Sequence, residues 1–187
     1  MLFRSSSSDL ANALIGGWSL SGVVDSHTGF PWQTASNAFV ASYSNNAPGI
    51  LTGNRSIAKT QLTKLPTGGV SSFKNAAMAA DQYTGPVGFH IGSRNDLRGP
   101  GYFNADMGLA KNIPVYGEKV NLKFRADAFN VFNHPNFSIP SENVFNGLDE
   151  EDIQRGKGFG QISYTVTPVG NLNNGARVLE LSLRLEF

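Results

Sequence analysis

The chain has 187 residues, a length that fits one domain on the usual size of domains. Its 21 glycines, nine prolines and only 16% charged residues favour strands and long turns over helices. A formal net charge of +1 offers no basic field for nucleic acid, and the absence of cysteine excludes a disulfide scaffold, a thiolate metal site and a cysteine nucleophile.

The first predicted strand lies near residues 15–27. Between Trp18 and Asp25, larger apolar side chains alternate with serines and the aspartate, and this period of two is typical of a strand with two different faces. The pattern stops at Thr28–Pro31, where glycine and proline favour a turn.

Two long stretches lack convincing periodicity, at residues 33–98 and 133–157. We expect both to be loops, with one or two helical turns within Phe73–Ala80. A compact soluble domain seldom carries a structureless connection longer than ~12 to 15 residues, so two such stretches count against that class of protein.

Two strands with sharp alternation are predicted near residues 102–112 and 119–130. In each, one face is apolar and the other is almost entirely polar. The six residues between them include Pro114 and Gly117, which favour a turn. The two strands should therefore form an antiparallel hairpin.

Two further strands are predicted near residues 159–166 and 178–187. The first alternates over a short span and is either a hairpin partner of the last strand or an extension at the rim of the sheet. The last strand has the clearest pattern of the chain, because an unbroken apolar row alternates with glutamate, serine and arginine. The apolar row comprises Leu179, Leu181, Leu183, Leu185 and Phe187.

Strands with one apolar and one polar face occur in two different folds. In a β-sandwich the apolar face meets a second sheet, whereas in an outer-membrane barrel it meets lipid. No stretch of the chain approaches the ~18 to 20 apolar residues of a membrane helix. A ten-residue strand tilted by ~40° rises ~25 Å, the height of a barrel's apolar band, and ordinary strands average only ~5 to 6 residues.

These lengths favour an all-β fold in which an antiparallel sheet belongs to an outer-membrane β-barrel. The alternative is a soluble or cell-surface β-sandwich that binds carbohydrate or protein.

Several segments carry a family resemblance, and they occur in the same order as in that family. They are residues 17–22 (GWSLSG), 28–31 (TGFP), 95–104 (NDLRGPGYFN), 124–137 (FRADAFNVFNHPNF) and the alternating strand that ends at Phe187. In these segments the chain resembles the C-terminal end of a TonB-dependent outer-membrane receptor of the Oar-like branch. The resemblance implies transport, namely energy-coupled uptake of an unidentified solute across the cell outer membrane.

The same resemblance implies partners. Receptors of this kind have an N-terminal plug with a TonB-contacting segment and about 22 strands. A closed membrane barrel needs at least ~8 strands, so we expect the antiparallel sheet of this chain to form the C-terminal part of a large transmembrane β-barrel, incomplete as a segment or fragment. The implied partners are the rest of the barrel and plug, the TonB complex through the absent N-terminal part, the barrel assembly machinery and outer-membrane lipid, with no nucleic acid.

The candidate site residues follow from the resemblance and from the polar face of the strands. The terminal strand, with Leu179, Leu181, Leu183, Leu185 and Phe187, resembles the signal read by the assembly machinery. The charged residues of the polar face would line the lumen, where they pair with one another or contact the plug or a solute. They are Asp106, Lys123, Arg125, Asp127, Arg184 and Glu186.

Signals for an enzyme, a metal or a cofactor are weak. His27, His90 and His134 lack the spacing of a metal site, and the acidic run Asp149–Asp152 lacks the pattern of a calcium loop. The glycine-rich Gly156–Gly160 fits neither phosphate-binding motif and is better explained as the beginning of a strand. We therefore predict no catalytic activity, no metal and no cofactor.

Overall fold

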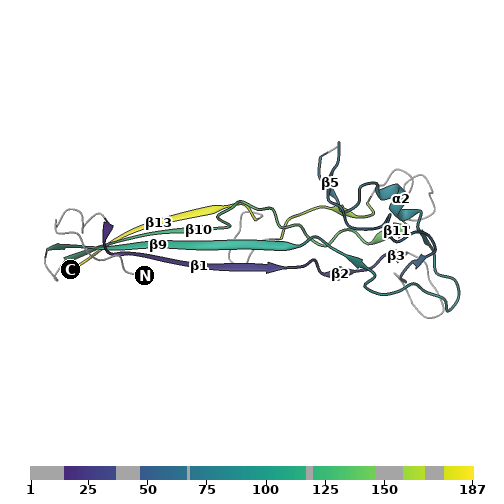
Figure 1. Ribbon diagram of the computed structural model, residues 1–187, viewed down its shortest axis with the longest axis horizontal. Helices are drawn as coiled ribbons and strands as arrows, with labels where there is room; N and C mark the ends of the chain where they lie inside the picture. The colour runs from purple at the N-terminus through teal and green to yellow at the C-terminus, as the bar shows by residue number, and fades with distance from the viewer. Residues whose placement is uncertain (1–14, 37–46, 67, 117–119, 146–157, 167–174) are drawn as a thin grey trace. The chain divides into compact units, whose positions relative to one another are not determined.

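The structure is a computed structural model that describes residues 15–36, 47–66, 68–116, 120–145, 158–166 and 175–187 (Figure 1). It divides the chain into two compact units. The sheet unit comprises Met1–Ser26, Phe103–Pro135 and Thr167–Phe187, and the loop unit comprises His27–Tyr102 and Asn136–Val166. The sequence predicted one segment with two long loops, and those loops form most of the second unit.

The sheet unit contains a four-stranded sheet in the order β1-β9-β10-β13, and Figure 1 shows its strands side by side. Pairing is antiparallel between β9 and β10 and between β10 and β13. Among the described residues this sheet is open, with β1 and β13 at its edges, and it does not close into a barrel. The strands are β1 (Trp18–His27), β9 (Tyr102–Tyr116), β10 (Val120–Phe129) and β13 (Val178–Glu186).

The β9–β10 hairpin confirms the pairing predicted from the matched alternation of the two segments. β9 extends beyond the expected end at residue 112, through Pro114 to Tyr116. Proline lacks a backbone donor and is confined in sheets to edges, strand ends and bulges, and the register shifts at Val120/Asn121, opposite this part of β9. The irregularity accommodates Pro114 near the end of a longer strand.

The segment 159–166 differs from its prediction. It contains only the two-residue strand β12 (Gln161–Ile162), which pairs with β6 (Val70–Ser71) and belongs to the loop unit. Phe159 and Ile162 are buried, whereas Tyr164 is 69% exposed, so burial here does not follow the alternation and the segment is not a partner of the last strand.

The loop unit is built from short elements. Its longest described strand has three residues and its helix α2 (Ala76–Ala80) has five, so the predicted loops are largely irregular, and the expected helical turns lie within Phe73–Ala80. Within the described ranges, no helix is long and apolar enough to cross a membrane. The remaining short strands are β2 (Pro31–Trp32) paired with β8 (Leu97–Arg98), β3 (Ala35–Ser36) with β11 (Asn143–Phe145), β4 (Ile50–Leu51) with β7 (Tyr83–Thr84), and β5 (Thr63–Lys64) with β6.

An aromatic cluster holds the loop unit together. The Phe73 and Phe159 rings stack with centroids 5.0 Å apart, and the Trp32 ring lies 6.0 Å from Phe73 and 6.1 Å from Phe159. Tyr83 adds an edge contact with Phe159 at 6.4 Å. Gly160 has a positive φ of 69°, and a Cβ there would collide with the Phe73 ring. The loops are compact because aromatic residues from distant segments share one core.

Candidate functional site

One face of the sheet is apolar and exposed. On β13, Leu179, Leu181, Leu183 and Leu185 are between 54% and 75% exposed. The register continues this row across the sheet, because apolar residues lie opposite apolar residues: Leu185 opposite Leu122, Leu183 opposite Phe124, Leu181 opposite Ala126 and Leu179 opposite Ala128. Soluble monomers rarely expose so continuous an apolar surface, whereas hydrocarbon is its natural solvent in a membrane barrel.

A single basic residue interrupts the apolar face of the β9–β10 hairpin. Lys111 lies opposite Phe124, and its Nζ is 4.6 Å from the centroid of the Trp18 ring. Trp18 also meets Phe124 edge-on, with centroids 6.3 Å apart. The ring quadrupole of a tryptophan attracts a cation over its face, so Trp18 provides Lys111 with a favourable contact on this face. The sequence analysis did not include Lys111, although it follows the same alternation as Met107 and Leu109.

The opposite face carries a network of charges near one end of β10 and β13. Lys123 lies directly across from Arg184, a placement that would be repulsive by itself. The Glu186 carboxylate contacts both cations, with Oε2 2.7 Å from Lys123 Nζ and Oε1 3.4 Å from Arg184 Nε. Glu186 thus compensates the repulsion between the two basic residues.

A second charge pair lies further along β10. Arg125 donates two hydrogen bonds to Asp127, from Nε to Oδ2 at 2.6 Å and from Nη2 to Oδ1 at 3.0 Å. Gly108 lies opposite Asp127, and a Cβ there would come 2.8 Å from Asp127 Oδ1, so the glycine leaves room for the pair. Glu180 lies across from Asp127 on β13 and is a member of this face that the sequence analysis left out.

Asp106, the sixth predicted charge, has a different role from the other five. Its Oδ1 accepts hydrogen bonds from Asn104 Nδ2 at 3.0 Å and from the Asn130 backbone N–H at 2.8 Å. Asp106 therefore holds the turn that follows β10 instead of joining the charge pairs.

Asn130 is the centre of that turn. Its side chain is almost fully buried, with a residue exposure of 1%. Nδ2 donates to the carbonyls of His134 at 2.9 Å and Gly175 at 2.6 Å, and Oδ1 accepts from the His134 N–H at 2.9 Å. Its φ of 50° is one that asparagine tolerates better than most residues. This network of hydrogen bonds connects the end of β10 to the segment that leads into β13. The periodicity of the sequence does not predict it.

The three histidines and the end of the glycine-rich segment lie in the described part of the chain. His27 and His90 belong to the loop unit and His134 to the sheet unit, and the described residues contain no group of three potential metal ligands. The run Asp149–Asp152 lies outside the described residues. Gly158 and Gly160 have positive φ and directly precede β12, which agrees with the beginning of a strand.

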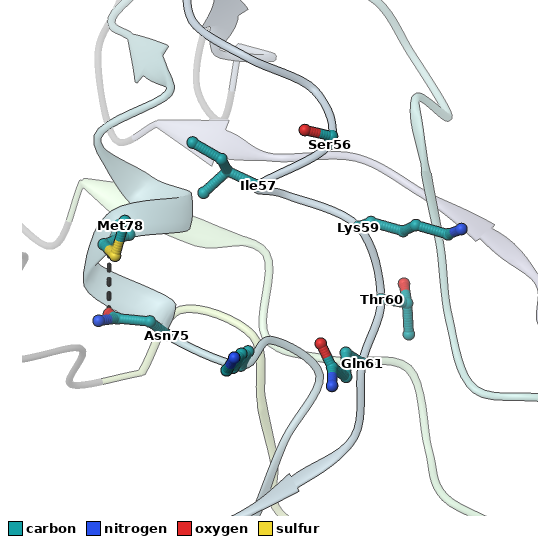
Figure 2. Close-up of a pocket in the computed structure, with 8 residues that line it drawn as sticks. Ser56, Ile57, Lys59, Thr60, Gln61, Asn75 and Met78 are labelled. Atoms are coloured by element: carbon teal, nitrogen blue, oxygen red, sulfur yellow. Dashed lines mark hydrogen bonds between the residues drawn. The ribbon is translucent and has the colours of Figure 1, made fainter.

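The loop unit contains a pocket of about 680 Å³ between α2 and the segment of residues 56–61 (Figure 2). Asn75 and Met78 contribute to one wall, and Ser56, Ile57 and Gln61 to the facing wall. Asn75 Oδ1 accepts a hydrogen bond from the Met78 N–H at 3.1 Å.

A second pocket, of about 420 Å³, adjoins a partly buried hydrogen bond. Arg55, His90 and Asp96 are among its lining residues. The Tyr83 hydroxyl donates to Asp96 Oδ2 at 3.1 Å, and Arg55 Nη2 donates to the Asp96 carbonyl at 3.3 Å. Burial raises the pKa of Tyr83, with a further contribution from the Asp96 charge. Burial likewise raises the pKa of Asp96, against the lowering effects of the Tyr83 hydrogen bond and the Arg55 charge.

Long paired strands with a continuous exposed apolar face and a charged opposite face define the wall of a membrane β-barrel. A protein-family model described as an outer membrane beta barrel domain matches residues 2–179. The chain belongs to this family, and its location is the outer membrane. This assignment decides between barrel and sandwich in favour of the barrel. Comparisons with curated proteins and with solved structures gave no match.

Proposed function

We propose that the chain is the C-terminal part of a TonB-dependent receptor, in which it forms wall and loops for energy-coupled uptake of a solute. The observation that carries the proposal is that two of the receptor-like segments, which are far apart along the chain, pair with each other in the structure. Residues 28–31 and 95–104 meet through the β2–β8 pair, and a Cβ on Gly29 would collide with the Gly99 carbonyl. The glycines of the resemblance therefore have a physical reason, namely close approach of two backbones.

The polar face supplies the second support. In the proposed receptor it lines the lumen, where the plug and the passing solute would meet it. Arg125 is paired with Asp127, and Lys123 with Glu186. A wall of internally paired charges is polar enough to stay hydrated, yet it attracts a passing charge less than isolated charges would. Such a surface suits a plug that must move along the wall.

The experiment that tests TonB dependence uses the full-length receptor purified in detergent and the periplasmic domain of TonB. We expect the receptor to bind this domain, and a variant lacking the N-terminal TonB-contacting segment to lose the interaction. A receptor that fails to bind TonB and conducts ions constitutively in planar bilayers would be a passive pore, and this outcome would overturn the proposal.

We further propose that β13 is read by the barrel assembly machinery. Phe187 follows the end of β13 and is 99% exposed, so its removal forfeits little packing within the described structure. We expect deletion of Phe187 to lower the yield of the full-length receptor in the outer membrane, while Phe187→Tyr preserves it. Refolding into detergent should be the same for all three proteins. Equal outer-membrane yields would remove the role of Phe187 in assembly.

A further inference from the structure

The pocket between α2 and residues 56–61 has the size of a small-molecule site. Its volume of about 680 Å³ falls within the ~300 to 1,000 Å³ typical of ligand pockets. All of its lining comes from the loop unit, so its shape does not depend on the sheet. The lining residues are Ser56, Ile57, Lys59, Thr60, Gln61, Lys74, Asn75 and Met78.

The charge of this lining is one-sided. The described lining residues include two lysines, Lys59 and Lys74, and no aspartate or glutamate. Neither lysine has an ion-pair partner among the described residues. A concave surface with two uncompensated cations attracts anions, and low-dielectric walls strengthen that attraction.

The remaining polar groups also favour an acceptor-rich ligand. The hydroxyls of Ser56 and Thr60 are already used, in hydrogen bonds to Asn54 and to the Arg98 carbonyl. Asn75 Oδ1 is used by Met78, which leaves the Asn75 Nδ2 donors. The side-chain amide of Gln61 has no hydrogen-bond partner within the described part of the chain. The donors left for a ligand are therefore the two ammonium groups and the side-chain amides of Gln61 and Asn75, while the Ser56 and Thr60 hydroxyls have only acceptor lone pairs left.

Figure 2 shows how these groups are arranged. Ile57 and Met78 provide apolar surface on facing walls, and the Lys59 side chain runs along the segment with its ammonium pointing away from α2. An exposed lysine has a flexible four-carbon stem, so rotation about its side-chain bonds can bring the ammonium to a bound anion.

We propose that this pocket binds an anionic organic solute that carries carboxylates or phosphates. Binding itself follows from the pocket's chemistry. The role of the solute as the transported substrate rests on the proposed receptor function.

The test uses the full-length receptor in detergent and three probes: trigalacturonate, the neutral trisaccharide galactotriose, and inorganic pyrophosphate. The two sugars are similar in size and differ in their carboxylates, so the comparison isolates charge. We expect one or both anions to bind, with affinity that falls as salt rises, and galactotriose to bind at least about tenfold more weakly. Failure of both anions to bind, or equal binding of the neutral sugar, would overturn the inference.

The matched variants locate the site. We expect the double variant Lys59→Gln/Lys74→Gln to weaken anion binding by about tenfold or more. Lys64→Gln removes a cation of β5 that does not line the pocket and should leave binding unchanged. Equal effects of the double variant and Lys64→Gln would show that the anion binds elsewhere. Since binding is measured without TonB, it can hold even where TonB dependence fails.

Discussion

Asn130 shows how one side chain can determine the path of a strand connection. At one buried site its side-chain amide donates hydrogen bonds to the backbone carbonyls of His134 and Gly175 and accepts one from the His134 N–H. Only an amide of this size offers both roles and tolerates the positive φ. Asp106 also accepts a hydrogen bond from the Asn130 backbone N–H, so this network joins residues from three parts of the sheet unit.

We expect Asn130→Asp to destabilise the sheet unit by about 1–3 kcal/mol or more, because the new carboxylate oxygen would face two carbonyl oxygens. Asn133→Asp is the matched control. Asn133 also has a positive φ, and its Oδ1 accepts from the Arg177 N–H at 3.0 Å, a role that aspartate keeps. Urea unfolding of the full-length protein, followed by heat-modifiable gel migration, measures the unfolding midpoint of both variants. Equal unfolding midpoints for the two variants would contradict the role of Asn130.

Asp96 gives the loop unit a pH dependence. Because burial raises its pKa in the folded state, ionisation of Asp96 opposes folding. The stability it contributes is fully present below the ordinary aspartate pKa of about 3.9 and is lost as pH rises through the raised value. Asp96→Asn removes this ionisation and keeps an oxygen that can accept from the Tyr83 hydroxyl.

We therefore expect Asp96→Asn to match or exceed the wild type in loop-unit stability at neutral pH, with a difference that shrinks as pH falls toward 4. Limited proteolysis of the loop unit at several pH values measures this difference. A difference between the two proteins that stays constant with pH would show that Asp96 ionisation is not coupled to folding.

The two faces of β13 differ, because one is apolar and exposed and the other carries charged residues. Leu183 belongs to the exposed apolar row, and Glu180 lies on the opposite face, across from Asp127. We expect Leu183→Arg to cost about 2–4 kcal/mol, because it would place a charge in hydrocarbon near mid-strand.

Glu180→Arg places the same side chain opposite Asp127 and should be tolerated far better. Ser182 is a poorer control, since an arginine there would face Arg125. Folding titrations of the full-length protein into lipid vesicles compare the two variants. A larger loss from Glu180→Arg than from Leu183→Arg would reverse the assignment of the lipid face.

The two units differ in what holds them together. The sheet unit depends on strand pairing and, in a membrane, on lipid around its apolar face, whereas the loop unit has an aromatic core of its own. Because the cores are separate, damage to one need not unfold the other.

Phe73→Ala tests that separation. The Phe73 residue is 1% exposed, and the truncation should cost the loop unit about 3–5 kcal/mol. We expect the segments of the loop unit to become sensitive to protease, while the barrel keeps its heat-modifiable migration on a gel. Phe89→Ala, at a position 81% exposed, is the matched control and should leave both properties unchanged. Loss of the folded barrel in Phe73→Ala would show that the two units unfold together.

The amino-acid sequence by itself determined the long strands and their two faces. Alternation between apolar and polar residues is a local property, and a one-residue error in register would exchange the faces, so the pattern predicts the β9–β10 hairpin and the shared face of Lys123, Arg125 and Asp127. The turn at Pro114 was placed too early because proline marks strand ends as well as turns.

The tertiary structure alone decided where the irregular segments go. Trp32, Phe73 and Phe159 come from three segments far apart along the chain, yet they form one core, and β12, which follows Phe159, pairs with β6 rather than with the last strand. Asn130 and Lys111 likewise acquire their roles from Gly175 and Trp18, partners far away along the chain. Local patterns specify which face of a strand a residue occupies. Packing between distant segments decides which residue it contacts, and these contacts form only when the whole chain has folded.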